Sequence, residues 1–104
     1  MEKFFYVEKI FPMRKITVKG RNGEVNDISA LGFVLSCGKD QLCAEAFGDM
    51  ADALHEEGLK EGSLVWMAVE LYTREWKSER GNSGLSNEAR ITFVRTGQKT
   101  FKPY

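Results

Sequence analysis

The sequence QLCAEAFGDMADALHEEGLKEGSLVWMAVELYTREW, residues 41–76, determines the predicted fold because it encodes a strand, a helix and another strand in succession. Residues 41–47 alternate small or apolar side chains with larger or polar ones, as in a strand that buries one face. Residues 63–76 alternate in the same way. Their predicted buried face consists of Val65, Met67, Val69 and Leu71.

A short helix is predicted between these two strands. Asp49 is the expected N-cap, because its carboxylate can accept hydrogen bonds from the unpaired N–H groups of a first turn. Apolar residues then recur at helical spacing as far as about Glu57. Gly58 is a typical stop signal, because glycine readily adopts the left-handed conformation that ends many helices. This is the only helix that the sequence predicts.

The segments on either side of this region have the composition of strands. Residues 4–11, 27–37 and 85–94 are rich in apolar, β-branched and aromatic residues and are separated by glycine-containing turns. Asn22-Gly23 predicts a tight hairpin, because both residues tolerate positive φ. RGNSG, residues 80–84, predicts a loop.

Three strands, a short helix and two further strands are the element order of an OB fold. An SH3-like barrel lacks the helix, and a split βαβ fold needs two helices. We therefore expect an all-β protein, a five-stranded OB-fold barrel with one short α-helix between strands three and four. Residues 1–96 are the expected OB-fold domain, and residues 97–104 are expected to form a short, loosely ordered C-terminal tail.

Length, charge and composition restrict the class of protein. The 104 residues fit one domain, and 42% hydrophobic against 29% charged residues indicates a globular chain. Net charge is zero, so it gives no general support for a polyanionic partner. Acidic groups are concentrated in residues 48–63, which we interpret as a solvated helix face. No apolar run is long enough to cross a membrane, and we expect a cytoplasmic protein.

Catalysis, cofactors and metals are not expected. Two cysteines, Cys37 and Cys43, and a single histidine, His55, cannot complete a four-ligand zinc site. We interpret the cysteines as free buried thiols. No Ser/His/Asp or Cys/His arrangement is present, and the glycine-containing loop at residues 81–84 lacks the lysine of a phosphate-binding loop.

Aromatic residues on otherwise polar strand faces are the candidate binding site. Strand alternation places Phe47, Tyr72 and Trp76 on faces that carry charged groups. Aromatic rings stack on nucleobases, and basic residues contact phosphates, which is how single strands are bound without sequence preference. The predicted phosphate contacts are Arg74, Lys77 and Arg80. Alternatively, these rings cover an end of the barrel or a subunit interface. We interpret Trp66 as a residue of the core or of an interface.

Residues 46–84 closely resemble the bacterial single-stranded DNA-binding protein family. The motifs are Phe47-Gly48 at a strand end, KEGS at residues 60–63, and LYTREW at residues 71–76, which fits the family's Leu-x-Thr-Arg-x-Trp ending. The match runs without a gap from about Phe47 to Ile91 and is loose before it. The resemblance implies a cytoplasmic OB protein that binds single strands, usually as a homotetramer, with Phe47 and Trp76 as stacking residues.

This chain departs from the family in three respects. The family's other stacking tryptophans would fall near Lys39 and at Gln41, where no ring is present. Tyr72 stands where a basic residue is common. The chain lacks the long tail with an acidic tip that recruits replication, repair and recombination partners, so recruitment of that kind is expected to be absent.

The leading hypothesis is a non-catalytic protein that coats or protects single-stranded DNA and forms a homo-oligomer, a dimer or a tetramer. RNA stays an alternative, because stacking and phosphate contacts serve both polymers. The second hypothesis is of a different class. The protein would be an OB-fold subunit of a larger, primosome-like assembly and would bind other proteins, with weak or no nucleic-acid binding. Neutral charge and the missing tryptophans favour that second hypothesis.

Overall fold

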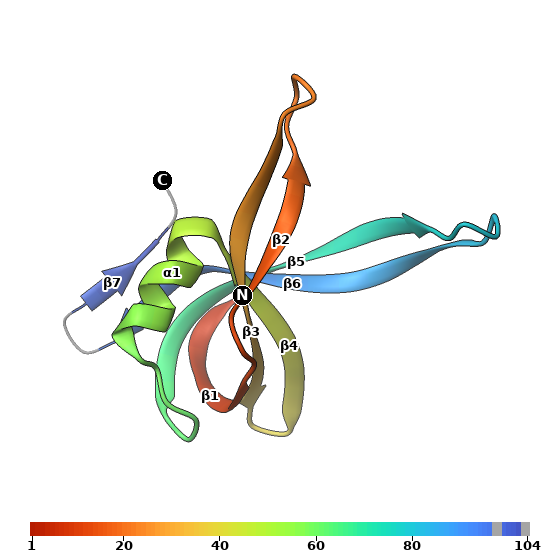
Figure 1. Ribbon diagram of the computed structural model, residues 1–104. Coiled ribbons are helices and arrows are strands. Elements are labelled where there is room, and N and C mark those ends of the chain that lie inside the picture. Colours follow the sequence, from red (N-terminus) through yellow and green to blue (C-terminus); the bar gives the residue numbers. More distant parts are fainter. Residues whose placement is uncertain (97–98, 103–104) are drawn as a thin grey trace.

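The computed structural model describes residues 1–96 and 99–102 and is mostly β, with one short helix (Figure 1). The elements in chain order are β1 (Glu2–Ile10), β2 (Arg14–Lys19), β3 (Val25–Cys37), β4 (Asp40–Phe47), α1 (Gly48–Glu57), β5 (Leu64–Lys77), β6 (Ser83–Thr96) and β7 (Lys99–Phe101). No helix within the described residues is long and apolar enough to cross a membrane.

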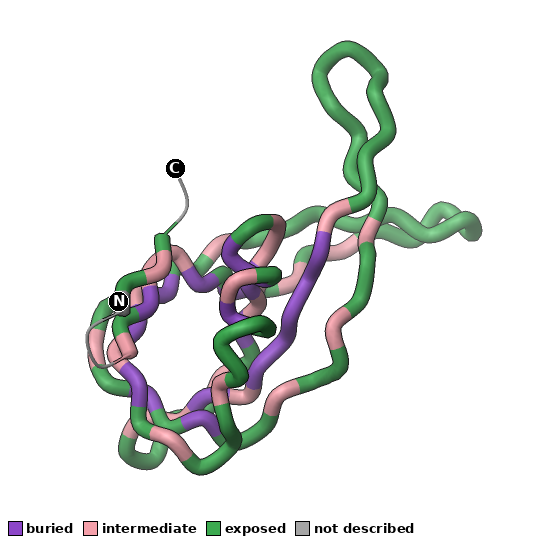
Figure 2. The backbone as a smooth tube through the Cα atoms, turned by 60° about the vertical axis from the view of Figure 1, so that its left-hand side comes forward, coloured by how far each residue is buried: buried purple, intermediate pink, exposed green. Residues whose placement is uncertain are grey.

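The strands form one mixed sheet whose pairings close into a circuit. The order is β1-β5-β6-β4-β3-β2, and β1 also pairs with β3. Every pairing is antiparallel except that of β4 with β6, which is parallel and has Glu45 opposite Arg90. Figure 2 shows these strands around a common interior, toward which the buried stretches are gathered. β2 and β7 lie outside the circuit, on β3 and β6 respectively.

The interior is filled by alternate residues of the circuit strands. Its largest fully buried side chains include Phe5, Phe33, Leu35 and Met67. Burying each such side chain contributes on the order of 1.5 to 3 kcal/mol, which is the main favourable term for a domain of this size. α1 adds its apolar side, Met50, Ala51 and Leu54, to the same cluster.

Two hairpins project from this body (Figure 1). One joins β2 to β3 through residues 20–24, so the hairpin predicted from Asn22-Gly23 is present. Gly23 has φ +79°, but Asn22 does not have positive φ. The other joins β5 to β6 and is the longer arm of the molecule. Both hairpins are largely exposed toward their tips (Figure 2), so they add little to the core and are available for contacts.

The β2 strand is a difference from the sequence-based prediction, which assigned no strand to residues 14–19. RKITVK has only two apolar residues, Ile16 and Val18, and the strand stays largely exposed. It is held by pairing with β3 along its whole length rather than by burial. Lys15 also donates a hydrogen bond to the buried hydroxyl of Ser29 at 2.9 Å.

The helix ends as predicted but begins differently. Gly58 is the C-cap, with φ +73° and its N–H bonded to the carbonyls of Leu54 and His55. Asp49 was predicted as N-cap, and this is wrong: Phe47 occupies that position and makes no side-chain cap bond. Asp49 lies in the first turn, where a carboxylate still interacts favourably with the helix dipole.

Two other predictions differ from the structure. Leu71 was expected in the core but is 61% exposed, because β5 continues beyond the circuit into the projecting arm. The tail was expected to be loosely ordered, whereas residues 99–101 form β7, which pairs with the end of β6. Phe101 packs against the core cluster. The rest of that prediction, at residues 97–98 and 103–104, lies outside the described residues.

Candidate nucleic-acid interface

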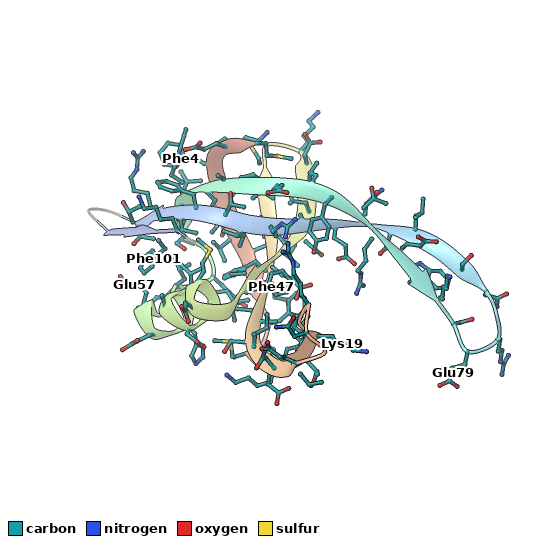
Figure 3. All side chains as sticks on the ribbon, turned by 90° about the horizontal axis from the view of Figure 1, so that it is seen from above. Phe4, Lys19, Phe47, Glu57, Glu79 and Phe101 are labelled. Carbon is teal, nitrogen blue, oxygen red and sulfur yellow. The ribbon has the colours of Figure 1, made fainter. Side chains whose placement is uncertain are left out.

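The candidate site lies on one side of the arm, which we define as residues 70–90. Figure 3 shows the arm extending from the body of the molecule to its tip near Glu79. Directly paired residues of antiparallel strands present their side chains on the same side of the sheet. One side of the arm therefore carries four consecutive cross-strand pairs, here called the ladder face: Glu70 with Arg90, Tyr72 with Glu88, Arg74 with Ser86, and Trp76 with Gly84.

Trp76 is the outermost ring of the ladder face. Its indole lies against Gly84 so closely that a Cβ atom on Gly84 would be 2.6 Å from Cζ2 of Trp76. The side chain is 45% exposed. Glycine thus provides a flat backbone surface on which the indole rests, while much of the ring remains open to solvent.

Arg74 lies beside Trp76 on the ladder face and is held by a carboxylate. Its guanidinium is 2.8 Å from Glu88 Oε1, and the Arg74 side chain remains 67% exposed. The Ser86 hydroxyl is 3.2 Å from the same Glu88 oxygen. An ion pair this exposed contributes little to stability, so a phosphate can compete with Glu88 for the guanidinium.

Tyr72 lies at the base of the arm, next to Arg90. The guanidinium of Arg90 lies 4.4 Å from the centre of the Tyr72 ring, within the range of a cation–π contact. Arg90 also forms an ion pair with Glu70 at 3.2 Å. Tyr72, Arg74 and Trp76 therefore lie in a row on the ladder face. Arg74 and Arg90 each form an ion pair with one carboxylate of this face, Glu88 and Glu70 respectively.

The two other predicted phosphate contacts lie away from this row. Lys77 follows Trp76 and, by strand alternation, belongs to the opposite side of the arm. Arg80 is exposed in the turn at the tip, which is closed by hydrogen bonds from Gly81 N–H to Ser78 carbonyl and from Ser78 N–H to Asn82 carbonyl. Within the described part of the chain, neither basic side chain has an ion-pair partner.

Phe47 lies on the body rather than on the arm (Figure 3). It is half-buried where β4 meets α1 and lines a cavity of about 430 Å³. The other lining residues are Asp49, Met50 and Ala53 of α1, with Thr100, Phe101 and Lys102. The structure thus brings Phe47 together with α1 and β7 and not with the rings of the ladder face.

Trp66, interpreted as a core or interface residue, is half-buried on the β1–β5 side. Its indole N–H donates to Glu2 Oε2 at 2.7 Å, and its ring meets the Phe4 ring edge-on at 5.0 Å. Arg95 lies 5.4 Å from the centre of the same ring. These contacts make Trp66 part of a surface aromatic cluster rather than of the interior.

Sequence reasoning did not single out Phe11. Its backbone N–H donates to the Gly32 carbonyl at 2.9 Å, and its ring covers Gly32 on β3. A usable signal was present, because a glycine within an otherwise bulky strand often marks the close approach of another group.

Neither the thiols nor the acidic segment at residues 48–63 belongs to the ladder face. Cys37 is half-buried, Cys43 is exposed, and both are free; the prediction that both are buried is wrong for Cys43. No group of three or more metal-ligating side chains gathers anywhere in residues 1–96 and 99–102.

Comparisons with models of protein families and with curated proteins find no significant match to this chain. The resemblance carried by residues 46–84 therefore remains a prediction.

Proposed function

We propose that the protein is a non-catalytic OB-fold protein that binds single-stranded DNA and so coats or protects single strands. The proposed fold is supported by the closed circuit of pairings, whose strands in chain order are β1, β3, β4, β5 and β6. The helix falls between the third and fourth of these strands, as in a five-stranded OB barrel. β2 then extends the barrel as one side of a hairpin.

The contact of Trp76 with Gly84 is the observation that carries the proposed function. An indole supported on one side by backbone and open on the other offers a surface on which a base can stack. Such stacking contributes about 1 to 3 kcal/mol per base and tolerates any sequence, because every base has a π-face. Tyr72 and Arg74 continue the same row toward the body.

Charge has a smaller role in this proposal. The arm holds four basic and four acidic residues, so its net charge is zero. Arg74 becomes available to a phosphate when it leaves Glu88, and Lys77 and Arg80 add further phosphate contacts near the tip. Binding is therefore expected to depend on stacking more than on counterion release, and to weaken only moderately with salt.

The test is the affinity of fluorescently labelled oligo-dT, measured by anisotropy at low and moderate salt. Trp76→Ala should weaken binding by about 5- to 150-fold, which corresponds to the loss of one stacked base. Leu85→Ala is the matched control, since Leu85 is 72% exposed on the opposite side of the arm. Equal affinities for Trp76→Ala and the wild type would refute the site. The same measurement with an RNA strand of matched length and sequence shows whether the protein prefers DNA or RNA.

We also propose a homo-oligomer, a dimer or a tetramer, formed through the β1–β5 side of the sheet. Phe4 and Tyr6 of β1 lie beside Trp66 and Leu64 of β5, and Phe4, Tyr6 and Leu64 are 51%, 41% and 65% exposed. Adjacent exposed apolar side chains of this kind mark interaction surfaces. Sedimentation should give an oligomer for the wild type and a monomer for Leu64→Arg. A monomeric wild type would refute the assembly.

The proposed compartment is the cytoplasm, which agrees with the free thiols of Cys37 and Cys43, because reducing compartments keep cysteines unpaired.

The second candidate function is an interaction subunit without nucleic-acid binding. The zero net charge of the arm and the ion pairs that occupy Arg74 and Arg90 favour it. An oligomer that binds neither DNA nor RNA even at low salt would support this function over strand binding.

A further inference from the structure

A second aromatic surface lies at the end of β1, where Phe11 covers Gly32. A Cβ on Gly32 would be 3.3 Å from Cδ2 of Phe11, so the ring is in close contact with the strand backbone. The side chain is nevertheless 38% exposed. As with Trp76 and Gly84, a ring here rests on a glycine of a neighbouring strand and keeps part of its surface open.

Basic side chains flank this ring. The Lys9 ammonium lies 5.0 Å from the centre of the Phe11 ring. Arg14 forms an ion pair with Glu45 of β4, and its side chain is 49% exposed. These residues border a shallow pocket of about 210 Å³, which is lined by Phe11, Arg14, Gly32, Phe33, Cys43, Ala44 and Glu45.

The Phe11 surface and the ladder face belong to the same outer side of the sheet. Gly32 pairs with Glu45, and Glu45 pairs with Arg90 on β6. Arg90 in turn pairs with Glu70 and contacts Tyr72. Since directly paired residues share a side of the sheet, this row leads across β3, β4 and β6 to the ladder face without crossing to the interior.

We propose that Phe11 is a second nucleobase-stacking residue, with Lys9 and Arg14 as the phosphate contacts beside it. The inference rests on the proposed function, because it extends the path of a bound single strand from the arm onto β3 and β4. A base stacks on the open part of the ring, and the flexible Lys9 side chain moves from the ring to a phosphate. Phe11 thereby supplies an aromatic ring to the outer face of β3 and β4. The family resemblance places stacking rings near Lys39 and at Gln41, and this chain has no ring at either position.

The test compares Phe11→Leu with Phe4→Leu in oligo-dT binding, with Trp76→Ala as reference. Leucine keeps apolar bulk over Gly32 and removes the π-face. Phe4 is the matched control, since it is an exposed phenylalanine too but lies within β1 on the β1–β5 side, whereas Phe11 follows the end of β1. Two strand lengths are used, about 5 and about 16 nucleotides, which bracket the usual site sizes of one OB fold.

Phe11→Leu should weaken binding of the longer strand by about 5-fold or more and of the shorter strand less. Phe4→Leu should bind both strands like the wild type. Lys9→Gln should lower the salt slope for the longer strand by about 0.7, the value for one phosphate contact on a single strand. Thermal unfolding of each variant checks that the fold is kept.

A second measurement does not depend on how well Phe11→Leu folds. Phe11→Trp in a background of Trp66→Phe and Trp76→Phe leaves one indole, at the proposed site. Oligo-dT should quench its fluorescence in a saturable way, and absence of quenching under conditions where the variant binds would overturn the inference.

The outcomes separate this inference from the proposed function. If Trp76→Ala weakens binding while Phe11→Leu matches Phe4→Leu, the Phe11 site is wrong and strand binding by the arm stands. If Phe11→Leu and Phe4→Leu weaken binding equally, the loss is not specific to Phe11 and the inference is also wrong. If the wild type binds no oligonucleotide at low salt, both are overturned.

Discussion

The indole of Trp76 lies on the backbone of Gly84, its direct partner on the neighbouring strand, with no room for a Cβ atom between them. The contact fixes the position of the ring on an arm that is otherwise exposed. A ring that is held before a base arrives loses less conformational entropy on binding.

Gly84→Ala should therefore weaken binding of single strands by displacing the indole. The backbone at Gly84 does not have positive φ, so alanine introduces a steric conflict and no conformational strain. We expect a shift of the tryptophan emission and a loss of oligo-dT affinity smaller than that of Trp76→Ala. Leu85→Ala, on the opposite side of the same strand and exposed, is again the control. Wild-type affinity for Gly84→Ala would show that the support of the ring is irrelevant to binding.

Glu88→Gln should tighten binding, because it removes the carboxylate that holds Arg74. With the guanidinium released to a phosphate, the slope of log affinity against log salt should steepen by about 0.7. Glu75→Gln is the matched control: it removes the same charge from the opposite side of the arm, where no arginine is paired with it in the described structure. Equal effects of the two substitutions would mean that the net charge of the arm, and not the Arg74–Glu88 ion pair, controls the affinity.

Phe5→Ala and Phe4→Ala should differ widely in stability although the residues are adjacent. Phe5 is fully buried in the core cluster, whereas Phe4 is 51% exposed. Truncation of a buried phenylalanine costs about 3 to 5 kcal/mol because it leaves a cavity. Urea unfolding should show a loss of that order for Phe5→Ala and a loss of less than half as much for Phe4→Ala. Similar losses would contradict the assignment of the two faces of β1.

Local patterns were sufficient to predict most elements of this fold. Alternation predicted strands near residues 41–47 and 63–76, and Gly58 predicted the end of the helix, because each depends on neighbouring residues only. β2 was not predicted, since RKITVK buries little and forms a strand through its partner β3. Leu71 was misplaced because alternation cannot show where a strand leaves the body of the protein.

The same limit applies to the candidate site. Alternation was enough to group Tyr72, Arg74 and Trp76 on one side of β5. Their partners Gly84 and Glu88 follow from the register of β6 against β5, which one sequence does not determine. Phe47 was expected near these rings, but α1 and β7 enclose it, and that packing depends on contacts between distant segments.

The most direct test of the account is the fluorescence of the two tryptophans during titration with oligo-dT at low salt. We predict saturable quenching in the wild type and in Trp66→Phe, because the base stacks on Trp76. In Trp76→Phe, whose remaining indole is bonded to Glu2 on the β1–β5 side, quenching should be absent. Quenching that persists in Trp76→Phe, or a wild type whose fluorescence does not respond, would contradict the central claim that Trp76 stacks on single-stranded DNA.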